Sequence, residues 1–304
     1  MKPILLLAIP LGKAFEANVA DYFDISTDMT PRAGVEALVT VGNIVTDGPF
    51  MDGFPNLKII ACFGSGYENI DITAAKLRNI KVTNTVGANA STVADLAVGL
   101  LLASMRNIVY GDQNIRAGQW RGNLARMLFT PSVTGRHIGI IGMGAIGRKI
   151  GERMAGFETK IGYFNRSMKV DLRWRYFPSA LKLATWADVL IIAHRADDSN
   201  RHMVNAEVIK ALGKEGHIIN IAHGNAIDED ALIAALKDGT IAGAGLDVFQ
   251  GEPNVRPEFL QLNNVVLTPH IGGGTREAFA AMSAAVVNNI MAMAKGRALP
   301  NEVT

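Results

Sequence analysis

The 304-residue sequence contains a single cysteine, Cys62. An intrachain disulfide is therefore impossible, and disulfide-stabilised secreted scaffolds are excluded as a class. The composition fits a reducing compartment, and we predict a cytoplasmic location. Because Cys62 lies in the apolar run Leu57–Phe63, we expect a buried thiol that packs as a small hydrophobe and does not act as a nucleophile.

Charge and long apolar runs are also scarce. Charged residues make up 19% of the chain and the net charge is only +2, too little for a nucleic-acid surface. No uninterrupted apolar stretch reaches the ~18–20 residues of a membrane span. The short apolar segment Ile4–Leu11 is interpreted as a first strand and not as a signal peptide. We expect neither nucleic acid nor a membrane as a partner, and we predict no metal site.

The sequence does contain two successive alternations of short apolar runs with helical patterns, which is typical of parallel sheets covered on both faces. The first alternation has expected strands at Ile4–Ile9, Tyr22–Ser26, Ala37–Val41, Leu57–Ala61 and Ile80–Thr83, with helices such as Lys13–Asp21 and Ile72–Arg78. The second has six expected strands, at His137–Ile141, Lys160–Phe164, Val189–Ala193, His217–Ile221, Ala242–Leu246 and Val265–Thr268. Its expected helices are Ala145–Met154, Ser179–Thr185, Ala206–Leu212, Glu229–Lys237 and Arg276–Met293.

A long helix is predicted over Ser91–Ile108, followed by an irregular stretch, Gly111–Ser132, that forms either a dimer arm or a surface loop. The predicted fold class is α/β, with two domains that are both doubly wound parallel sheets. Residues 1–99 with 274–304 form a flavodoxin-like substrate domain, and residues 100–273 form a Rossmann dinucleotide-binding domain. The chain length agrees with two domains.

The most informative motif is a glycine turn between an expected strand and an expected helix. It reads Gly142-Met143-Gly144-Ala145-Ile146-Gly147. The first glycine allows a tight turn, the second lets the backbone approach a pyrophosphate, and the third lets helix and strand pack closely. The N-terminus of the helix offers unpaired N–H groups to the phosphates. The motif therefore predicts a bound dinucleotide.

The end of the next strand indicates which dinucleotide. A site specific for NAD usually has a carboxylate here for the ribose 2′-OH, whereas this chain has Asn165, Arg166 and Ser167, with Lys169 near. A guanidinium and neutral donors attract a 2′-phosphate. We predict that NADP(H) is preferred over NAD(H). The predicted cofactor-binding set is completed by His194, Ile221 and Asp247 at the ends of later strands.

Glu252 and His270 lie in turn-like segments that follow strands of the second domain. Loops at the carboxyl ends of parallel strands line the ligand crevice, so the two side chains are expected to meet as an acid–base pair. A carboxylate orients the imidazole and favours its protonated form, which a proton donor to a carbonyl requires.

At these residues the chain resembles the D-isomer-specific 2-hydroxyacid dehydrogenase family, in its glyoxylate/hydroxypyruvate reductase-like branch. Further matching segments are Phe63-Gly64-Ser65-Gly66-Tyr67-Glu68-Asn69-Ile70-Asp71, Val82-Thr83-Asn84-Thr85, Val93-Ala94-Asp95-Leu96-Ala97 and Gly243-Ala244-Gly245-Leu246-Asp247-Val248-Phe249. The resemblance implies hydride transfer from nicotinamide to a 2-keto acid, giving the (R)-2-hydroxy acid. It implies that His270 is the general acid/base, that Glu252 holds it, and that backbone N–H groups of Gly64, Ser65 and Gly66 receive the substrate carboxylate.

One departure from the family is His223. The family pattern Asn-x-x-Arg-Gly has an arginine there that pairs with the substrate carboxylate; here the segment is Asn220-Ile221-Ala222-His223-Gly224. Three interpretations stay open: a weaker, pH-dependent anchor, a different substrate, or a lost activity. Arg195 on a neighbouring loop either supplies the missing guanidinium or contacts cofactor phosphate.

The sequence thus predicts a homodimeric, NADP(H)-dependent reductase of a small 2-keto acid such as glyoxylate or hydroxypyruvate, with catalytic residues His270, Glu252 and His223. The alternatives are a reductase of an atypical carbonyl substrate and a non-catalytic NADP(H)-binding sensor. An acid–base pair argues against the sensor, which has no use for one. Arg173-Trp174-Arg175-Tyr176 is interpreted as a solvated loop beside the cofactor domain, in preference to a recognition patch.

Overall fold

The structure is a computed structural model that describes residues 2–120, 129–195 and 198–303. The chain divides into two compact units, Met1–Ala90 with Gly273–Thr304, and Ser91–Gly272. The sequence predicted the first division at 99/100. It falls at 90/91 because helix α4 (Ala90–Met105) packs along nearly its whole length into the core of the second unit, through Val93, Ala97 and Leu101.

The first unit is built on a five-stranded parallel sheet of order β2-β1-β3-β4-β5. This is the flavodoxin-like order that the sequence predicted. The strands are β1 (Ile4–Leu7), β2 (Asp24–Ser26), β3 (Val35–Thr40), β4 (Ile59–Cys62) and β5 (Lys81–Thr83). Each expected strand is confirmed, and no end is shifted by more than two residues.

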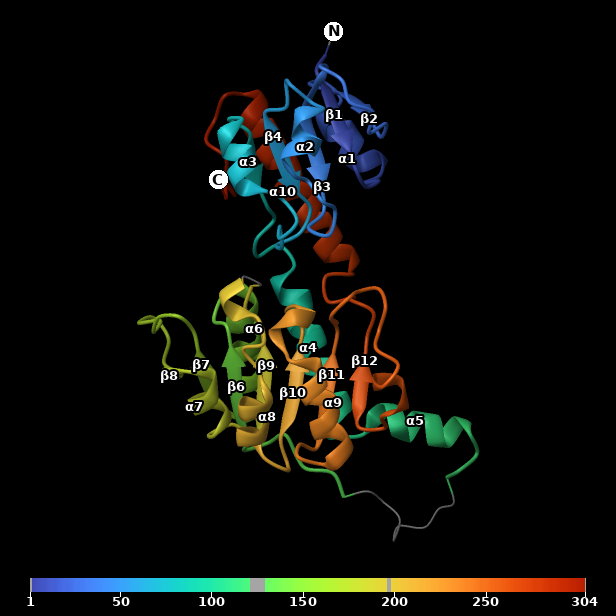
Figure 1. Cartoon of the computed structure of the whole chain (residues 1–304), viewed down its shortest axis with the longest axis vertical. Helices are drawn as coiled ribbons and strands as arrows, with labels where there is room; N and C mark the ends of the chain where they lie inside the picture. The colour runs from blue at the N-terminus through green and yellow to red at the C-terminus, as the bar shows by residue number, and fades with distance from the viewer. Residues whose placement is uncertain (1, 121–128, 196–197, 304) are drawn as a thin grey trace. The chain divides into compact units, whose positions relative to one another are not determined.

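Helices cover both faces of this sheet (Figure 1). Along β1, Leu5 and Leu7 pack with α1 (Lys13–Val19) and α10 (Arg276–Ala294), whereas Leu6 packs with α2 (Gly48–Asp52) and α3 (Ile72–Leu77). This alternation follows the two-residue period of a strand. Cys62 is fully buried, and its burial, with a smaller effect of Glu68, raises the pKa of the thiol to about 12. It therefore packs as a protonated hydrophobe, as predicted.

Helix α10 is, among the described residues, the one helix that is long and apolar enough to cross a membrane by length and composition. Helices α4 and α5 (Ile108–Arg116) pass the same test only if they are joined across their 63° bend. Core helices of soluble proteins pass it too, and α10 places Val286 and Ile290 in the core of the first unit.

The second unit contains a seven-stranded parallel sheet of order β12-β11-β10-β9-β6-β7-β8, which is the Rossmann order with one strand added at the β12 end. Its strands are β6 (His137–Ile141), β7 (Lys160–Phe164), β8 (Arg175–Phe177), β9 (Val189–Ile192), β10 (His217–Asn220), β11 (Gly243–Leu246) and β12 (Val265–Leu267). The sequence predicted six and missed β8. The interpretation of residues 173–176 as a loop holds for Arg173 and Trp174 but is wrong for Arg175 and Tyr176, which pair with Gly162 and Tyr163.

Helices α4 and α6 (Ala145–Ala155) cover one face of this sheet, and α7 (Ala180–Ala184), α8 (Ala206–Leu212) and α9 (Glu229–Asp238) cover the other. Among the described residues, short 3-10 turns connect elements at Asp198–Asn200, Gly224–Ala226 and Phe259–Gln261. Part of the stretch predicted to be irregular is helical, because α5 occupies Ile108–Arg116. The remainder of that stretch includes residues 121–128, which lie outside the described part of the chain.

A buried histidine at the start of β10 links two elements of the second unit. The Nδ1 atom of His217 lies 2.9 Å from the hydroxyl of Ser104 on α4. Burial, with a smaller contribution from Arg136, lowers the pKa of His217 to about 4. The folded protein therefore keeps this imidazole neutral in mildly acidic solution.

We predict an acid-sensitive contribution of His217 to stability. Between its unfolded pKa of 6.5 and its folded pKa of about 4, the unfolded chain takes up a proton that the folded chain does not. Stability is therefore lost as the pH falls through this window, by up to about 1.4 kcal/mol per pH unit. Denaturant unfolding at several pH values should show a shallower dependence for His217→Gln than for the wild type. Identical slopes would contradict the assignment.

Candidate active site

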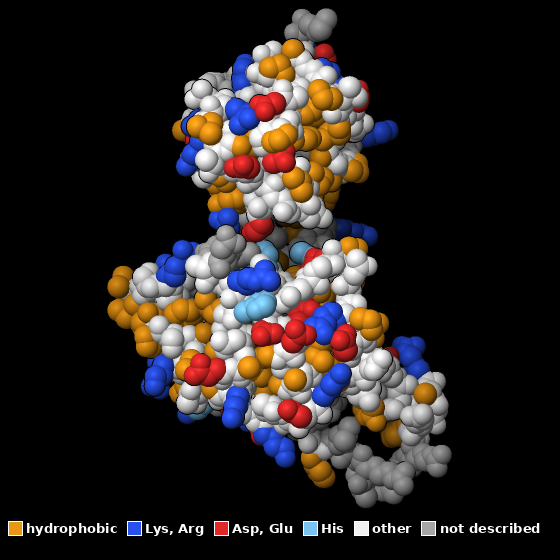
Figure 2. Space-filling model, in the orientation of Figure 1, with side chains coloured by type: hydrophobic (Ala, Val, Ile, Leu, Met, Phe, Trp, Pro, Cys, Tyr) orange, Lys and Arg blue, Asp and Glu red, His pale blue; other side chains and the backbone are white. Residues whose placement is uncertain are grey.

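The predicted functional residues of the second unit gather at the carboxyl ends of its strands, towards which the arrows point in Figure 1. Figure 2 shows histidine side chains exposed at this end of the unit. The segments concerned are 142–147 after β6, 165–167 after β7, 194–195 after β9, 221–224 after β10, 247–252 after β11 and 268–272 after β12.

Each glycine of the turn after β6 has a different environment. Gly142 has φ 99°, and a Cβ there would lie 2.5 Å from the backbone of His194. A Cβ on Gly147 would lie 2.0 Å from the Gly142 carbonyl oxygen. At Gly144, by contrast, nothing lies within 4 Å, and this residue begins α6 without a side-chain cap. The space over Gly144 and the uncapped helix N-terminus fit the pyrophosphate of a dinucleotide.

The segment after β7 presents no available carboxylate. Asn165 Oδ1 accepts a hydrogen bond from the Met143 N–H at 3.3 Å, so this segment is joined to the glycine turn. Arg166 and Ser167 are exposed. The next carboxylate along the chain, Asp171, pairs with Arg148 at 2.6 Å. The local charge therefore suits a 2′-phosphate better than a ribose hydroxyl.

The other predicted cofactor residues after β9 and β10 are positioned by backbone contacts. His194 lies against Gly142, and its Nδ1 is 2.9 Å from the Arg195 carbonyl oxygen. Arg195 is exposed, and its carbonyl also accepts a hydrogen bond from Asn200 Nδ2 at 2.7 Å. Ile221 is buried among residues of α4 and α6, so its side chain packs in the core beneath the site.

His270 and Glu252 meet as the sequence predicted. His270 Nδ1 lies 2.7 Å from Glu252 Oε2, and Glu252 Oε1 accepts the Phe249 N–H at 2.9 Å. The His270 side chain is 61% exposed, whereas that of Glu252 is 33% exposed. With Nδ1–H donating to the carboxylate, Nε2 is the ring nitrogen left for a substrate.

Asp247 fixes the loop that carries His270. Its buried carboxylate accepts hydrogen bonds from the Thr268 hydroxyl at 2.6 Å and from the Ile271 and Gly272 N–H groups at 2.9 and 2.8 Å. Its backbone carbonyl accepts the His270 N–H at 2.9 Å, and His270 has φ 53°, a left-handed conformation. The sequence assigned Asp247 to the cofactor; here both carboxylate oxygens bind the loop.

His223 lies on a loop that is pressed against the Glu252 loop. Asn220 Nδ2 donates to the His223 carbonyl at 2.9 Å. A Cβ on Gly224 would lie 2.0 Å from the carbonyl carbon of Phe249, so only glycine permits this approach. The His223 side chain is half-buried.

Glu229 was not predicted from the sequence and supports the same loop. It is 4% exposed, and its Oε1 accepts the Gln250 N–H at 2.7 Å. Burial raises the pKa of Glu229. The Gln250 side chain donates to the Ile227 carbonyl at 2.7 Å. Glu229 follows the helix cap Asp228, and nothing in the local sequence marks it as more than a first-turn acid.

The predicted substrate loop belongs to the first unit and is fastened by polar residues that follow β5. The Gly64 N–H donates to the Thr85 hydroxyl at 3.0 Å, and the Ser65 carbonyl accepts from Asn84 Nδ2 at 2.9 Å. The Ser65 hydroxyl donates to Asn89 Oδ1 at 3.2 Å. Gly64 has φ 142°, which favours glycine.

The Gly66 carbonyl, at the end of this loop, contacts Cys62 and Gly42. It accepts a hydrogen bond from the Cys62 thiol at 3.0 Å and would lie 2.5 Å from a Cβ on Gly42. Loop 64–66 is thus a rigid, glycine-shaped turn. Asn84, Thr85 and Asn89, which support the loop, were not predicted to be functional. Asn84 and Thr85 do lie in the segment Val82–Thr85 that matches the family.

A Rossmann sheet with an open glycine turn and a histidine–carboxylate pair at the same end defines the class of dinucleotide-dependent oxidoreductases. The family profile described as "D-isomer specific 2-hydroxyacid dehydrogenase, NAD binding domain" matches residues 98–272. The chain therefore belongs to the D-isomer specific 2-hydroxyacid dehydrogenase family, as its motifs suggested.

The chain is similar to several named reductases. Glyoxylate/hydroxypyruvate reductase A from Arabidopsis thaliana is 39% identical over 89% of this chain and 86% of its own length. Hydroxyphenylpyruvate reductase from Plectranthus scutellarioides is 38% identical over 87% and 84%. The crystal structure of NADPH-dependent glyoxylate/hydroxypyruvate reductase from Sinorhizobium meliloti, in complex with NADP and malonate, has a TM-score of 0.90 at 35% identity, covering 100% and 97% of the two chains.

We predict that Glu229 positions the loop of Glu252. Glu229→Ala leaves the Gln250 N–H without its acceptor, so turnover should fall about tenfold with a smaller change in KM. Glu229→Gln keeps an oxygen for this N–H and should restore most of kcat. The matched control is Glu207→Ala, an exposed first-turn acid of α8. A Glu229→Ala enzyme with wild-type kcat, or no rescue by glutamine, would disprove the role.

Proposed function

We propose that the protein catalyses NADP(H)-dependent reduction of a small 2-keto acid to the (R)-2-hydroxy acid, with glyoxylate and hydroxypyruvate as the leading substrates. The observation that carries the proposal is the 2.7 Å contact between His270 and Glu252 at the cofactor end of the sheet. The names of the relatives support the substrate class.

The chain's residues divide into cofactor and proton-transfer groups. The turn of Gly142, Gly144 and Gly147, with Ala145 and Ile146 at the start of α6, would hold the pyrophosphate, and Asn165, Arg166 and Ser167 the adenosine end. A bound, reduced nicotinamide dinucleotide would supply the hydride. His270 would donate its Nε2 proton to the carbonyl oxygen as negative charge develops there, and Glu252 would stabilise the imidazolium and fix the ring orientation.

Because the Gly64 N–H already donates to the Thr85 hydroxyl, the backbone N–H groups that would receive the substrate carboxylate are those of Ser65 and Gly66. In the second unit, His223 would bind the carboxylate where the family has arginine. Histidine carries charge only in mildly acidic solution, so this anchor should work best below neutral pH. A substrate that differs from the small keto acids is the second candidate. The hydroxyphenylpyruvate reductase among the relatives favours an aryl-pyruvate as the case to test.

We also propose that the protein is a homodimer. Helix α5 has no buried residue, and it exposes Ile108, Val109, Tyr110 and Ile115. Exposed apolar helices of this kind are typical of protein interfaces. The cytoplasmic location rests on the cysteine content and stays a prediction.

The function is tested by following NADPH oxidation with glyoxylate, hydroxypyruvate, pyruvate and phenylpyruvate at about pH 6 and about pH 8. We expect fast turnover of a small keto acid, greater at the lower pH if His223 is the anchor. His270→Gln should reduce kcat about 10²- to 10⁴-fold. Turnover of phenylpyruvate alone would favour the second candidate. Cofactor binding without any turnover would overturn the proposal.

The cofactor preference is tested with Arg166→Gln. Loss of a charge-assisted contact to the 2′-phosphate should lower kcat/KM for NADPH about tenfold or more and leave the value for NADH nearly unchanged. Lys214→Gln is the matched control, because Lys214 is an exposed cation at the amino end of β10. A wild-type enzyme that uses NADH as well as NADPH would contradict the preference.

A further inference from the structure

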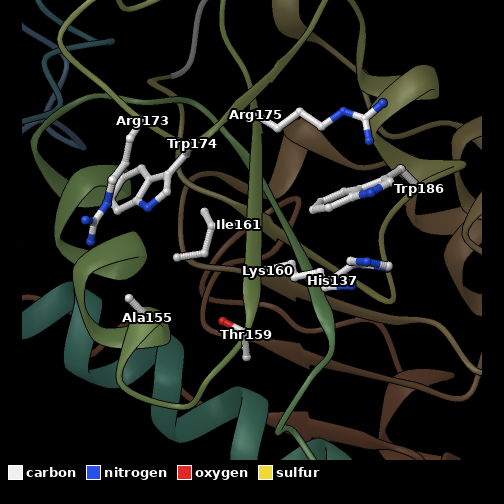
Figure 3. Close-up of a pocket in the computed structure, with 9 residues that line it drawn as sticks. All are labelled: His137, Ala155, Thr159, Lys160, Ile161, Arg173, Trp174, Arg175 and Trp186. Atoms are coloured by element: carbon white, nitrogen blue, oxygen red, sulfur yellow. The ribbon is translucent and has the colours of Figure 1, made fainter.

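The second unit has a surface cavity of about 580 Å³, widely open to solvent, at the amino ends of β6 and β7. Figure 3 shows its lining residues around the first half of β7. The glycine turn and the His270–Glu252 pair follow the carboxyl ends of the strands. This cavity is therefore separate from the proposed active site, and neither the cofactor nor the proton-transfer residues contribute to its lining.

An open strand edge forms the centre of the cavity. Strand β8 pairs with Gly162–Phe164 only, so no strand in the described part of the chain lies beside Lys160 and Ile161 on that side. The Lys160 N–H donates to the Arg136 carbonyl on the β6 side at 2.9 Å. Because successive residues of a strand alternate in direction, the Ile161 N–H points to the open edge. The edge thus offers a backbone donor to a ligand.

Two indole rings flank this edge, and glycines specify both positions. A Cβ on Gly151 of α6 would lie 2.3 Å from the Trp174 ring, and a Cβ on Gly162 of β7 would lie 2.6 Å from the Trp186 ring. In Figure 3 the rings of Trp174 and Trp186 lie on opposite sides of the strand. Both rings line the cavity, and their positions depend on the absence of side chains at the two glycines. The Trp186 ring also packs against His137 and Phe177, with ring centroids 4.4 and 5.1 Å away.

The cavity is positively charged. Lys160, Arg173 and Arg175 line it, no carboxylate does, and none of these three forms an ion pair with the described residues. The neighbouring carboxylate, Asp188, accepts the His137 N–H at 2.7 Å and lies 3.5 Å from Arg136. The Arg175 guanidinium lies 4.7 Å from the centre of the Phe177 ring, which holds it by a cation–π contact.

We propose that this cavity binds a small, planar aromatic carboxylate. The cations and the Ile161 N–H would receive the carboxylate group, and the Trp174 indole would stack on the aromatic ring of the ligand. A longer peptide strand fits less well, because β8 leaves only the two residues Lys160 and Ile161 of β7 open for pairing. The volume lies within the range of small-molecule sites.

The proposal is tested by calorimetric titration of the NADP-saturated protein with 2-naphthoate. We expect one binding event beyond any at the active site, with a Kd below about 1 mM. Lys160→Gln and Arg175→Gln, both exposed side chains, should each weaken it about tenfold, whereas Lys210→Gln on α8 should not. His270→Gln should leave this event unchanged, which separates it from binding at the active site.

Three results would overturn the proposal. They are no binding of 2-naphthoate up to the millimolar range, binding that the Lys160 and Arg175 variants do not weaken, and equal binding of the uncharged 2-naphthylmethanol. The replaced side chains lie on the surface, so the variants should fold normally, and circular dichroism checks that they do. The test requires no enzymatic turnover, so its outcome is independent of the proposed reaction.

Discussion

Close approach of backbone to backbone is the constraint on which the cofactor-binding unit depends. The Gly142 turn touches the backbone of His194, the Gly147 helix turn touches the Gly142 carbonyl, and the Gly224 loop touches the Phe249 carbonyl. Any Cβ at these positions would lie 2.0–2.5 Å from main-chain atoms, which cannot move aside as a flexible side chain can. The loop after β6 thereby contacts the loop after β9, and the loop after β10 contacts the loop after β11, all at one end of the sheet.

Buried or half-buried carboxylates then fix these loops in place. Asp247 binds two N–H groups of the His270 loop, Glu252 binds the Phe249 N–H, and Glu229 binds the Gln250 N–H. Hydrogen bonds from backbone donors to ionised acceptors are stronger than neutral ones. The imidazole that would transfer the proton therefore stands on a framework that is rigid before any ligand binds, which lowers the cost of orienting it for reaction.

Much of this arrangement can be predicted from the sequence, because buried parallel strands are continuous apolar runs and Gly142–Gly147 has a strand before it and a helix after it. What was missed has physical reasons. Strand β8 is a three-residue edge strand that contains Arg175 and Tyr176, so it has no apolar run. Helix α2 is a single turn capped by Asp47, and α5 buries no side chain, so neither shows the apolar period of a core helix. The supporting roles of Glu229 and Asn89 depend on tertiary contacts that leave no local signal.

The glycines also show why a residue type alone does not reveal a site. The space that a side chain would occupy is taken by backbone atoms at Gly142 and Gly147, and by indole rings at Gly151 and Gly162. All four glycines are therefore needed for packing within the protein. Gly144 alone of the turn has open space where its side chain would be. A ligand is expected where glycine creates room that the protein does not fill, which is the case at the cofactor end. At the amino end, glycines make room for Trp174 and Trp186, and the rings themselves become the walls. Glycine thus has two roles in the same unit. Gly144 leaves space for a ligand, whereas Gly151 and Gly162 leave space for the side chains that would bind one.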